Sequence, residues 1–229
     1  MVGKLNFPDV ETAMTLRNKY FKKYHSTAKA LAVAEEEGQL PIPDDWPQGQ
    51  KFFDANDLSE WWAEKLNFNL LGEKDPELIE MLESCPLKMV AFSNGPRKYV
   101  LRVLKEMGLD KVFPEERVFA VNDVLPHCKP EKEAFEFVFE KVGVKEPSEC
   151  IMVEDSMKNI RAAKELGMKT LLIAGLGRLQ NSNEGDKNAH ADAAEATKAG
   201  DAPDNNDPAV DCCIEHVKEM KSVLPGLWI

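Results

Sequence analysis

Three sites in this 229-residue sequence combine polar side chains with positions where α/β proteins bind ligands. The first is Ser93-Asn94-Gly95, which directly follows the apolar run 89–92 and precedes a segment of helical spacing. A hydroxyl and backbone N–H groups at the start of a helix suit an anion. The alternative is that Ser93 or Asn94 only caps the following helix, as such residues do in many proteins.

The second is Lys129, which directly precedes Pro130, the predicted first residue of a helix. The helix dipole disfavours a cation at a helix N-terminus by a few tenths of a kcal/mol or more. We therefore expect a phosphate or a carboxylate cluster to hold the charge of Lys129. A freely solvated lysine is the alternative.

A pair of adjacent acids, Glu154-Asp155, follows the apolar run 151–153. Carboxylates at the carboxyl end of a buried strand suggest magnesium, because this cation takes oxygen ligands and often uses one or two carboxylates together with a substrate phosphate. Ser156 is then the predicted N-cap of the next helix. The alternative is that both acids are favourably placed at a helix start and bind nothing.

Apolar runs of strand length position these residues. The runs 89–92, 151–153 and 170–174 show no alternation, which is typical of strands buried on both faces of a parallel sheet, and 117–121 is a weaker run. Segments of helical spacing between the runs end at Gly108, Gly143 and Gly167, where a left-handed residue is expected after a helix. Alternating strands and helices predict an α/β fold, a Rossmann-like parallel sheet with helices on both faces.

The chain before this sheet is predicted to be helical. Residues 1–80 lack a comparable apolar strand, and helix starts are indicated at Asp9, at Asp57 and at Asp75-Pro76. The aromatic residues after Asp57 are expected to pack in a core: Trp61, Trp62 and Phe68.

The predicted organisation has four parts. A helical domain over 1–80 precedes an α/β core over 81–178, and an acidic insertion over 179–208 is too polar to order itself. The fold resumes over 209–229 with a last strand and a C-terminal helix.

Composition excludes several classes of function. The net charge of -11 opposes binding to nucleic acid, and no apolar stretch is long enough to span a membrane. The first residues lack a secretory segment, and five cysteines without paired spacing predict reduced thiols. We therefore expect a cytoplasmic protein, for which whole nucleic acids are excluded as partners and small anions in a local basic pocket stay open.

Taken together, these motifs resemble the haloacid dehalogenase (HAD) superfamily. Its second, third and fourth motifs are a Ser or Thr after a strand, a Lys before a helix and an acid pair after a later strand. The strings AFSNG, CKPEKEAF and VEDSMKNIRAAKELGMKT resemble the pyrimidine 5'-nucleotidase-like branch, and so does the terminal Leu-Pro-x-Leu-Trp at 224–228. The helical region 1–80 resembles that branch's cap domain.

The resemblance implies a role for each site residue. Ser93 would bind the transferring phosphoryl group, with Asn94 in a supporting phosphate-binding position, and Lys129 would neutralise that group and orient the nucleophile. Asp155 would bind Mg²⁺ with Glu154 beside it. Asn159 matches a family position with a supporting role. The string Gly95-Pro96-Arg97 departs from the family pattern after the strand, and this departure bears on nucleobase preference.

The family's first motif, a strand ending in Asp-x-Asp that supplies the nucleophile and the general acid, is absent from this sequence. The resemblance places that strand in the centre of the sheet, between those ending at Ser93 and Asp155, and places Met1 inside the first cap helix. The segment 52–57 is not a substitute, since Asn56 cannot ionise and so cannot shuttle a proton.

Two functions follow as expectations. The first is a magnesium-dependent phosphomonoester hydrolase for nucleoside monophosphates or similar small phosphorylated metabolites, here an incomplete copy that binds Mg²⁺ weakly. The alternative is a non-catalytic protein that binds phosphate or an unknown protein partner.

Overall fold

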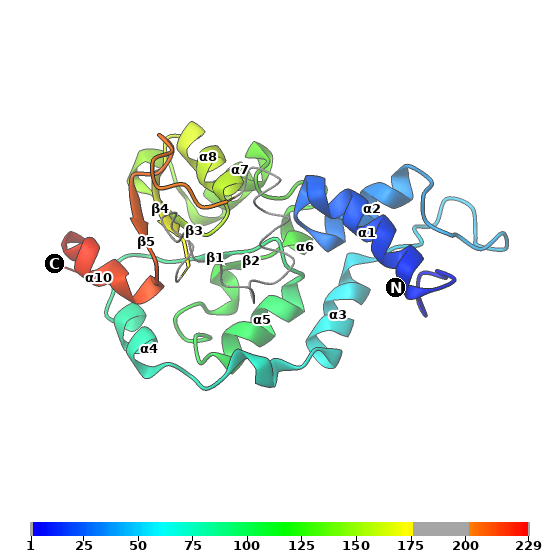
Figure 1. Cartoon of the computed structure of the whole chain (residues 1–229), viewed down its shortest axis with the longest axis horizontal. Helices are drawn as coiled ribbons and strands as arrows, with labels where there is room; N and C mark the ends of the chain where they lie inside the picture. Colours follow the sequence, from blue (N-terminus) through cyan, green and yellow to red (C-terminus); the bar gives the residue numbers. More distant parts are fainter. Residues whose placement is uncertain (1, 176–201, 229) are drawn as a thin grey trace, which may run out of the picture. The chain divides into compact units, whose positions relative to one another are not determined.

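The computed structural model describes residues 2–175 and 202–228, which include every predicted site residue. Most of the predicted acidic insertion, residues 179–201, lies outside the described residues. The chain forms two compact units (Figure 1), which we call the first and second unit. Their residue ranges are as follows: the first unit contains the residues up to Lys74 together with Met89–Lys129, and the second contains Asp75–Lys88 and the described residues from Pro130 onward.

Three helices begin the first unit: α1 (Val10–Tyr24), α2 (Thr27–Glu36) and α3 (Ala55–Lys65). α1 and α2 pack side by side (Figure 1). Asp9 caps α1 through the Thr12 amide at 2.7 Å, as predicted.

The predicted cap of α3 is wrong. Asp54, not Asp57, accepts the Asn56 amide and starts the helix. Asp57 lies inside the first turn and pairs with Lys4 at 2.9 Å. Both acids fit the start of a helix, and the side chain that reaches the first amide decides between them.

The rest of the first unit is a strand–helix–strand segment with two parallel strands. The short parallel strands β1 (Ala91–Phe92) and β2 (Val118–Phe119) flank α5 (Arg97–Glu106). α3 packs on α5, and Trp62 lies edge-on to Tyr99 with ring centroids 5.4 Å apart. Packing is thus confirmed for Trp62 and for Phe68, which also contacts Tyr99, but Trp61 is 49% exposed. The remaining short elements are η1 (Phe68–Leu71), η2 (Glu115–Arg117) and α6 (Val121–Val124).

Helical residues and strand-flanking residues share one core in the first unit. Leu31 of α2 and Phe53 belong to the same buried cluster as Val121 of α6 and Cys128. The first unit therefore combines the predicted helical region up to Lys74 with residues 89–129 of the predicted α/β core.

The second unit contains the other parallel strands. β3 (Ile151–Glu154), β4 (Lys169–Ile173) and β5 (Cys212–Ile214) pair in the order β3-β4-β5 (Figure 1). The helices α7 (Lys132–Val142) and α8 (Met157–Glu165) precede β3 and β4. The other elements of this unit are α4 (Pro76–Glu83), η3 (Pro147–Glu149), η4 (Val217–Glu219), α10 (Met220–Val223) and η5 (Pro225–Trp228).

The predicted α/β class with parallel strands is confirmed. Each of the four apolar runs overlaps a strand, the predicted last strand is present as β5, and Gly108, Gly143 and Gly167 after the helices have positive φ of 75°, 79° and 89°. The described strands form two sheets, β1-β2 and β3-β4-β5, so β1 and β3 belong to different sheets. These are the two strands between which the missing family strand was expected, and its place stays a prediction.

Residues 202–208, the end of the predicted insertion, lie within the described part of the chain. Asp207 accepts the Ala209 amide at 2.8 Å and pairs with Arg161 of α8 at 2.9 Å. Near the C-terminal end of the described chain, the indole N–H of Trp228 in η5 donates to the Met81 carbonyl of α4 at 3.2 Å. This bond connects η5 to α4 within the second unit.

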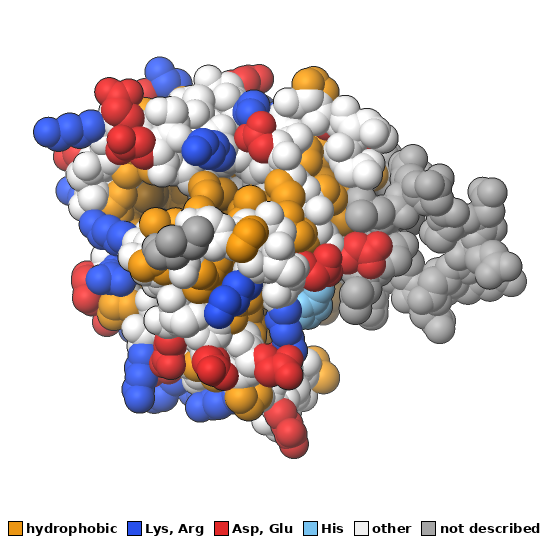
Figure 2. Space-filling view, turned by 90° about the vertical axis from the view of Figure 1, so that its left-hand side faces the viewer, with side chains coloured by type: hydrophobic (Ala, Val, Ile, Leu, Met, Phe, Trp, Pro, Cys, Tyr) orange, Lys and Arg blue, Asp and Glu red, His pale blue; other side chains and the backbone are white. Residues whose placement is uncertain are grey.

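On the face drawn in Figure 2, Asp and Glu side chains are interspersed with Lys and Arg side chains. No helix in the described ranges has the length and apolar character needed to cross a bilayer.

Candidate functional site

The loop between β1 and α5 carries the first predicted site residues. The Ser93 amide continues the ladder by donating to the Phe119 carbonyl at 2.8 Å, and the Ser93 Oγ accepts the Gly95 amide at 3.0 Å. α5 begins only at Arg97, with Pro96 in the N-cap position. Ser93 therefore lies in a tight turn one residue beyond the strand and does not cap the helix.

Asn94 links this loop to Lys129, which is 35 residues further along the chain. Its Nδ2 donates to the Lys129 carbonyl at 2.8 Å, and its Oδ1 accepts the Lys129 amide at 2.9 Å. One side-chain amide thus satisfies both backbone groups of Lys129. Because the two bonds act together, they fix the position of the Lys129 backbone from which the side chain extends.

Lys129 is 5% exposed, and its ammonium lies at the end of β1. Nζ donates to the Phe92 carbonyl at 2.8 Å and lies 5.1 Å from the centre of the Phe92 ring. In a parallel pair alternate residues point their backbone groups to opposite sides, and the Ser93 amide bonds to β2. The Phe92 carbonyl therefore points away from β2, and Lys129 lies on that edge of β1.

The predicted helix start at Pro130 is wrong. Lys129 and Pro130 form a turn, Glu131 is the N-cap, and α7 begins at Lys132. The macrodipole argument for an anion beside Lys129 therefore loses its basis, since the lysine lies outside the first turn. Burial next to Ser93 and Asn94 replaces it, because a buried ammonium needs acceptors or an anion. A freely solvated Lys129 is excluded.

The acid pair lies in the second unit, at the carboxyl end of β3. Glu154 Oε1 accepts the amides of Asp155 at 3.2 Å and Ser156 at 3.3 Å, and Asp155 is exposed. Ser156 holds the predicted N-cap position of α8, and Asn159 is buried in its first turn. Because Glu154 already closes the turn, Asp155 is the better candidate for a cation ligand.

The carboxylates at the end of β3 meet part of what Mg²⁺ requires of its ligands. Two adjacent carboxylates fit a cation that keeps several waters and shares its coordination with a phosphate. Among residues 2–175 and 202–228, no group of three His, Cys, Asp or Glu side chains could hold a metal alone. The residues therefore fit a site that is completed by other ligands.

The predicted phosphate-binding residues lie together in one unit, and the predicted metal ligands lie in the other. Ser93, Asn94 and Lys129 are adjacent in the first unit, whereas Glu154, Asp155 and Asn159 belong to the second. That both halves face one pocket stays a prediction.

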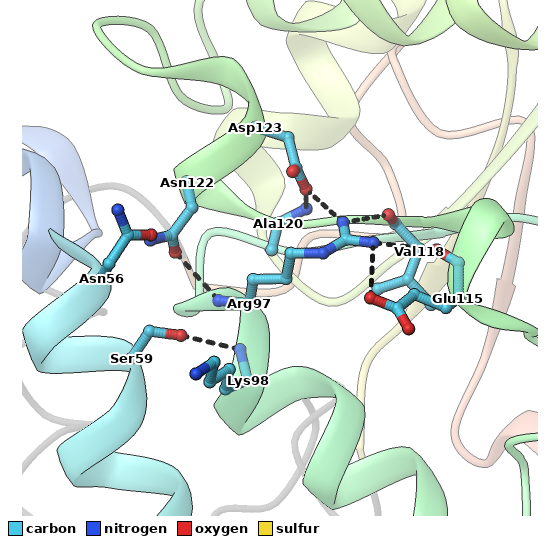
Figure 3. Close-up of polar contacts among 9 residues, drawn as sticks. All are labelled: Asn56, Ser59, Arg97, Lys98, Glu115, Val118, Ala120, Asn122 and Asp123. Atoms are coloured by element: carbon cyan, nitrogen blue, oxygen red, sulfur yellow. Dashed lines mark hydrogen bonds and ion pairs between the residues drawn. The ribbon is translucent and has the colours of Figure 1, made fainter.

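Arg97 has a structural role that the sequence did not indicate (Figure 3). Its Nη1 donates to the Asp123 carboxylate at 2.7 Å and to the Val118 carbonyl at 2.9 Å, and its Nη2 donates to the Glu115 carbonyl at 3.0 Å. The guanidinium therefore joins α5 to the chain around β2. The bearing of the Gly95-Pro96-Arg97 string on substrate choice stays a prediction.

Sequence reasoning missed two residues that contact the segments leading to Asn94 and Lys129. Ser26 Oγ donates to the Asn94 carbonyl at 3.0 Å, and Lys29 Nζ donates to the Pro126 carbonyl. Both are buried at the start of α2. The only available signal was Ser26 before an apolar helical run, which indicates a helix cap but not a long-range contact.

Comparison with known proteins defines the class. The model of the haloacid dehalogenase-like hydrolases matches residues 8–167, and the chain belongs to this family. The L-2-haloacid dehalogenase from Xanthobacter autotrophicus shares the fold, with a TM-score of 0.53 at 18% identity over 94% of this chain and 83% of that one.

Two relatives are phosphatases by name. A phosphoglycolate phosphatase from Pseudomonas syringae pv. tomato is 29% identical over 49% of this chain and 40% of its own length. A phosphorylated carbohydrates phosphatase from Thermotoga maritima is 27% identical over 45% of this chain and 48% of its own length. The chain thus spans less than half the length of these curated relatives.

Proposed function

We propose that this chain carries the phosphate-binding part of a phosphomonoester hydrolase that acts on small phosphorylated metabolites. The observation that carries the proposal is the buried ammonium of Lys129, joined through Asn94 to the Ser93 turn at the end of β1. A phosphoryl group bound there would receive one full positive charge from Lys129 and a hydroxyl donor from Ser93. Such preorganised donors are the main means of stabilising phosphoryl transfer.

Mg²⁺ is the proposed cofactor, with Asp155 as its ligand, Glu154 beside it and Asn159 in support. When bound, the ion would neutralise charge on the phosphoryl oxygens. The proposal rests on the carboxylates at the end of β3 and on the match to the family model.

The proposed substrates are small phosphate esters, and a narrower choice among them stays open. Small phosphate esters agree with both named relatives. Within them, the resemblance in sequence motifs favours nucleoside monophosphates, whereas the relatives' names favour phosphoglycolate or sugar phosphates. A panel with one representative of each separates these choices.

A second candidate is a non-catalytic phosphate-binding protein. The observation in its favour is that no Asp-x-Asp occurs anywhere in the 229 residues. Without such a pair this chain offers neither the attacking carboxylate nor the proton shuttle, and a shuttle alone is worth about 10² to 10⁴-fold in rate. We therefore expect phosphate binding without turnover from the chain as it stands.

Calorimetry with inorganic phosphate tests the binding site. Lys129→Met removes the charge at nearly constant volume and is expected to weaken binding at least tenfold, since charge-assisted bonds contribute about 1.5–3 kcal/mol each. Lys132→Met is the control, because this neighbouring lysine is 65% exposed and pairs with Glu136. Equal affinities for the two variants would contradict the proposed site.

Turnover of the substrate panel with Mg²⁺ tests the chemistry. This chain, its Asp155→Ala variant and a version carrying an added N-terminal Asp-x-Asp strand are compared. Activity only with the added strand supports the hydrolase, and binding without activity in all three supports the second candidate. Activity of the unextended chain that disappears in Asp155→Ala would refute the account of the missing nucleophile.

A further inference from the structure

The first turn of α2 lies against the loop that carries the proposed phosphate ligands. Ser26 is 2% exposed, and its hydroxyl makes two kinds of contact. It donates to the Asn94 carbonyl at 3.0 Å, and it accepts the Lys29 amide at 3.4 Å as the N-cap of α2. One buried hydroxyl therefore both starts a helix and holds a loop 68 residues away.

The same turn also contacts the segment that leads to Lys129. Lys29 Nζ donates to the Pro126 carbonyl and lies 5.3 Å from the centre of the Tyr24 ring. The Cys128 thiol donates to the Tyr24 carbonyl at 3.4 Å. Three contacts from the α1–α2 junction thus reach the two loops that meet at Asn94.

A continuous series of hydrogen bonds runs from α2 to the Lys129 ammonium. Ser26 fixes the main chain of Asn94, and the Asn94 side chain holds both backbone groups of Lys129 at 2.8 and 2.9 Å. From this anchored backbone the lysine reaches the end of β1. All of these residues belong to the first unit, so the series lies within one compact body.

We propose that Ser26 is a positioning residue for the phosphate site, holding Asn94 so that the ammonium of Lys129 and the hydroxyl of Ser93 are presented together. This inference rests on the proposed function of Ser93 and Lys129. It adds a dependence of phosphate affinity on the first turn of α2, a region whose own side chains have no assigned part in binding. Phosphate affinity would depend on this region through the hydrogen bond from Ser26 to the Asn94 carbonyl.

Two substitutions separate positioning from helix capping. Ser26→Gly removes the hydroxyl donor. As the N-cap of α2, glycine lowers helix stability by only a few tenths of a kcal/mol relative to serine. Ser26→Thr keeps both the donor and the cap. Asp9→Gly weakens the cap of α1, which the Thr12 amide completes at 2.7 Å, and serves as the control for a general loss of helix stability.

Hydrogen exchange at the Lys129 amide and calorimetric affinity for inorganic phosphate are measured on the full chain. For Ser26→Gly we expect faster exchange and roughly three- to tenfold weaker phosphate binding, the range that corresponds to one lost hydrogen bond. Ser26→Thr and Asp9→Gly are expected to stay within about twofold of the unsubstituted chain in affinity.

Each result decides the proposal. Unchanged exchange at Lys129 in Ser26→Gly overturns it whatever the phosphate result. Faster exchange with unchanged phosphate affinity also overturns it, because Ser26 would then be purely structural. If the unsubstituted chain binds no phosphate, the proposed function itself fails and the positioning role falls with it, a failure recognised before any variant is compared.

Discussion

Replacing Arg97 by alanine is expected to lower the free energy of unfolding of the first unit by about 2–4 kcal/mol. The guanidinium donates to the Asp123 carboxylate at 2.7 Å and to the carbonyls of Val118 and Glu115 at 2.9 and 3.0 Å (Figure 3). It also lies 3.5 Å from the exposed Glu115 carboxylate, a pair that adds little. Hydrogen bonds that involve a charged group contribute about 1.5–3 kcal/mol each, and neutral ones about 0.5–1.5 kcal/mol. The Arg97 side chain is 27% exposed, so solvent screening lowers each of the three bonds toward the neutral range, which gives a total of about 2–4 kcal/mol.

The Asp123 carboxylate raises the cost of losing Arg97. The same Oδ2 also accepts the Ala120 amide at 2.8 Å, so the carboxylate cannot turn to solvent without breaking that bond. Truncating one partner of a partly buried ion pair leaves the other with an uncompensated charge. The free energy of unfolding of Arg97→Lys should therefore lie between those of Arg97→Ala and the unsubstituted chain. A lysine can pair with Asp123 but cannot also bond to both carbonyls.

Urea denaturation followed by tryptophan fluorescence measures these differences, because Trp62 packs on α5. Lys98→Ala is the matched control at the next position. The Lys98 side chain pairs with Glu60 at 2.6 Å, but the two side chains are 58% and 53% exposed, and such pairs contribute at most about 1 kcal/mol. If Arg97→Ala costs no more than Lys98→Ala, or if Arg97→Lys equals the unsubstituted chain, the structural role given to Arg97 is wrong.

Three further predictions concern other parts of the chain. His25 ends α1 with φ of 48°, so His25→Gly should be more stable than His25→Ala by about 1 kcal/mol in thermal unfolding, and the reverse order would contradict this. The Ala209 amide, with Arg161 beside it, holds the pKa of Asp207 below its ordinary value, so its stabilisation is present above about pH 4 and is lost as pH falls through the folded pKa. Asp207→Asn should then be less stable than the unsubstituted chain at pH 7, with a smaller difference at pH 3; a constant difference would refute this. Trp228→Phe should cost about 1 kcal/mol through the bond to the Met81 carbonyl, and no loss in urea denaturation would show that this bond contributes nothing.

Local chemistry explains the features that the sequence determined by itself. The strands follow from runs of adjacent apolar residues, and the ends of α7 and α8 follow from Gly143 and Gly167, which take the left-handed conformation at little cost. Asp9 and Asp75 cap α1 and α4 because each side chain reaches an amide three residues away. Each of these outcomes depends on neighbours within a few residues.

Only the tertiary structure decided which residues of the candidate site act on one another. Asn94 holds Lys129 across 35 residues, Ser26 holds Asn94 across 68, and Arg97 reaches Asp123 across 26. No spacing in the sequence indicates these bonds, because the partners meet only when α2, β1 and the chain before α7 are folded together. For the same reason the start of α7 could not be predicted from Pro130. A proline at that position suits both a helix start and a turn, and the contacts that anchor Lys129 favour the turn.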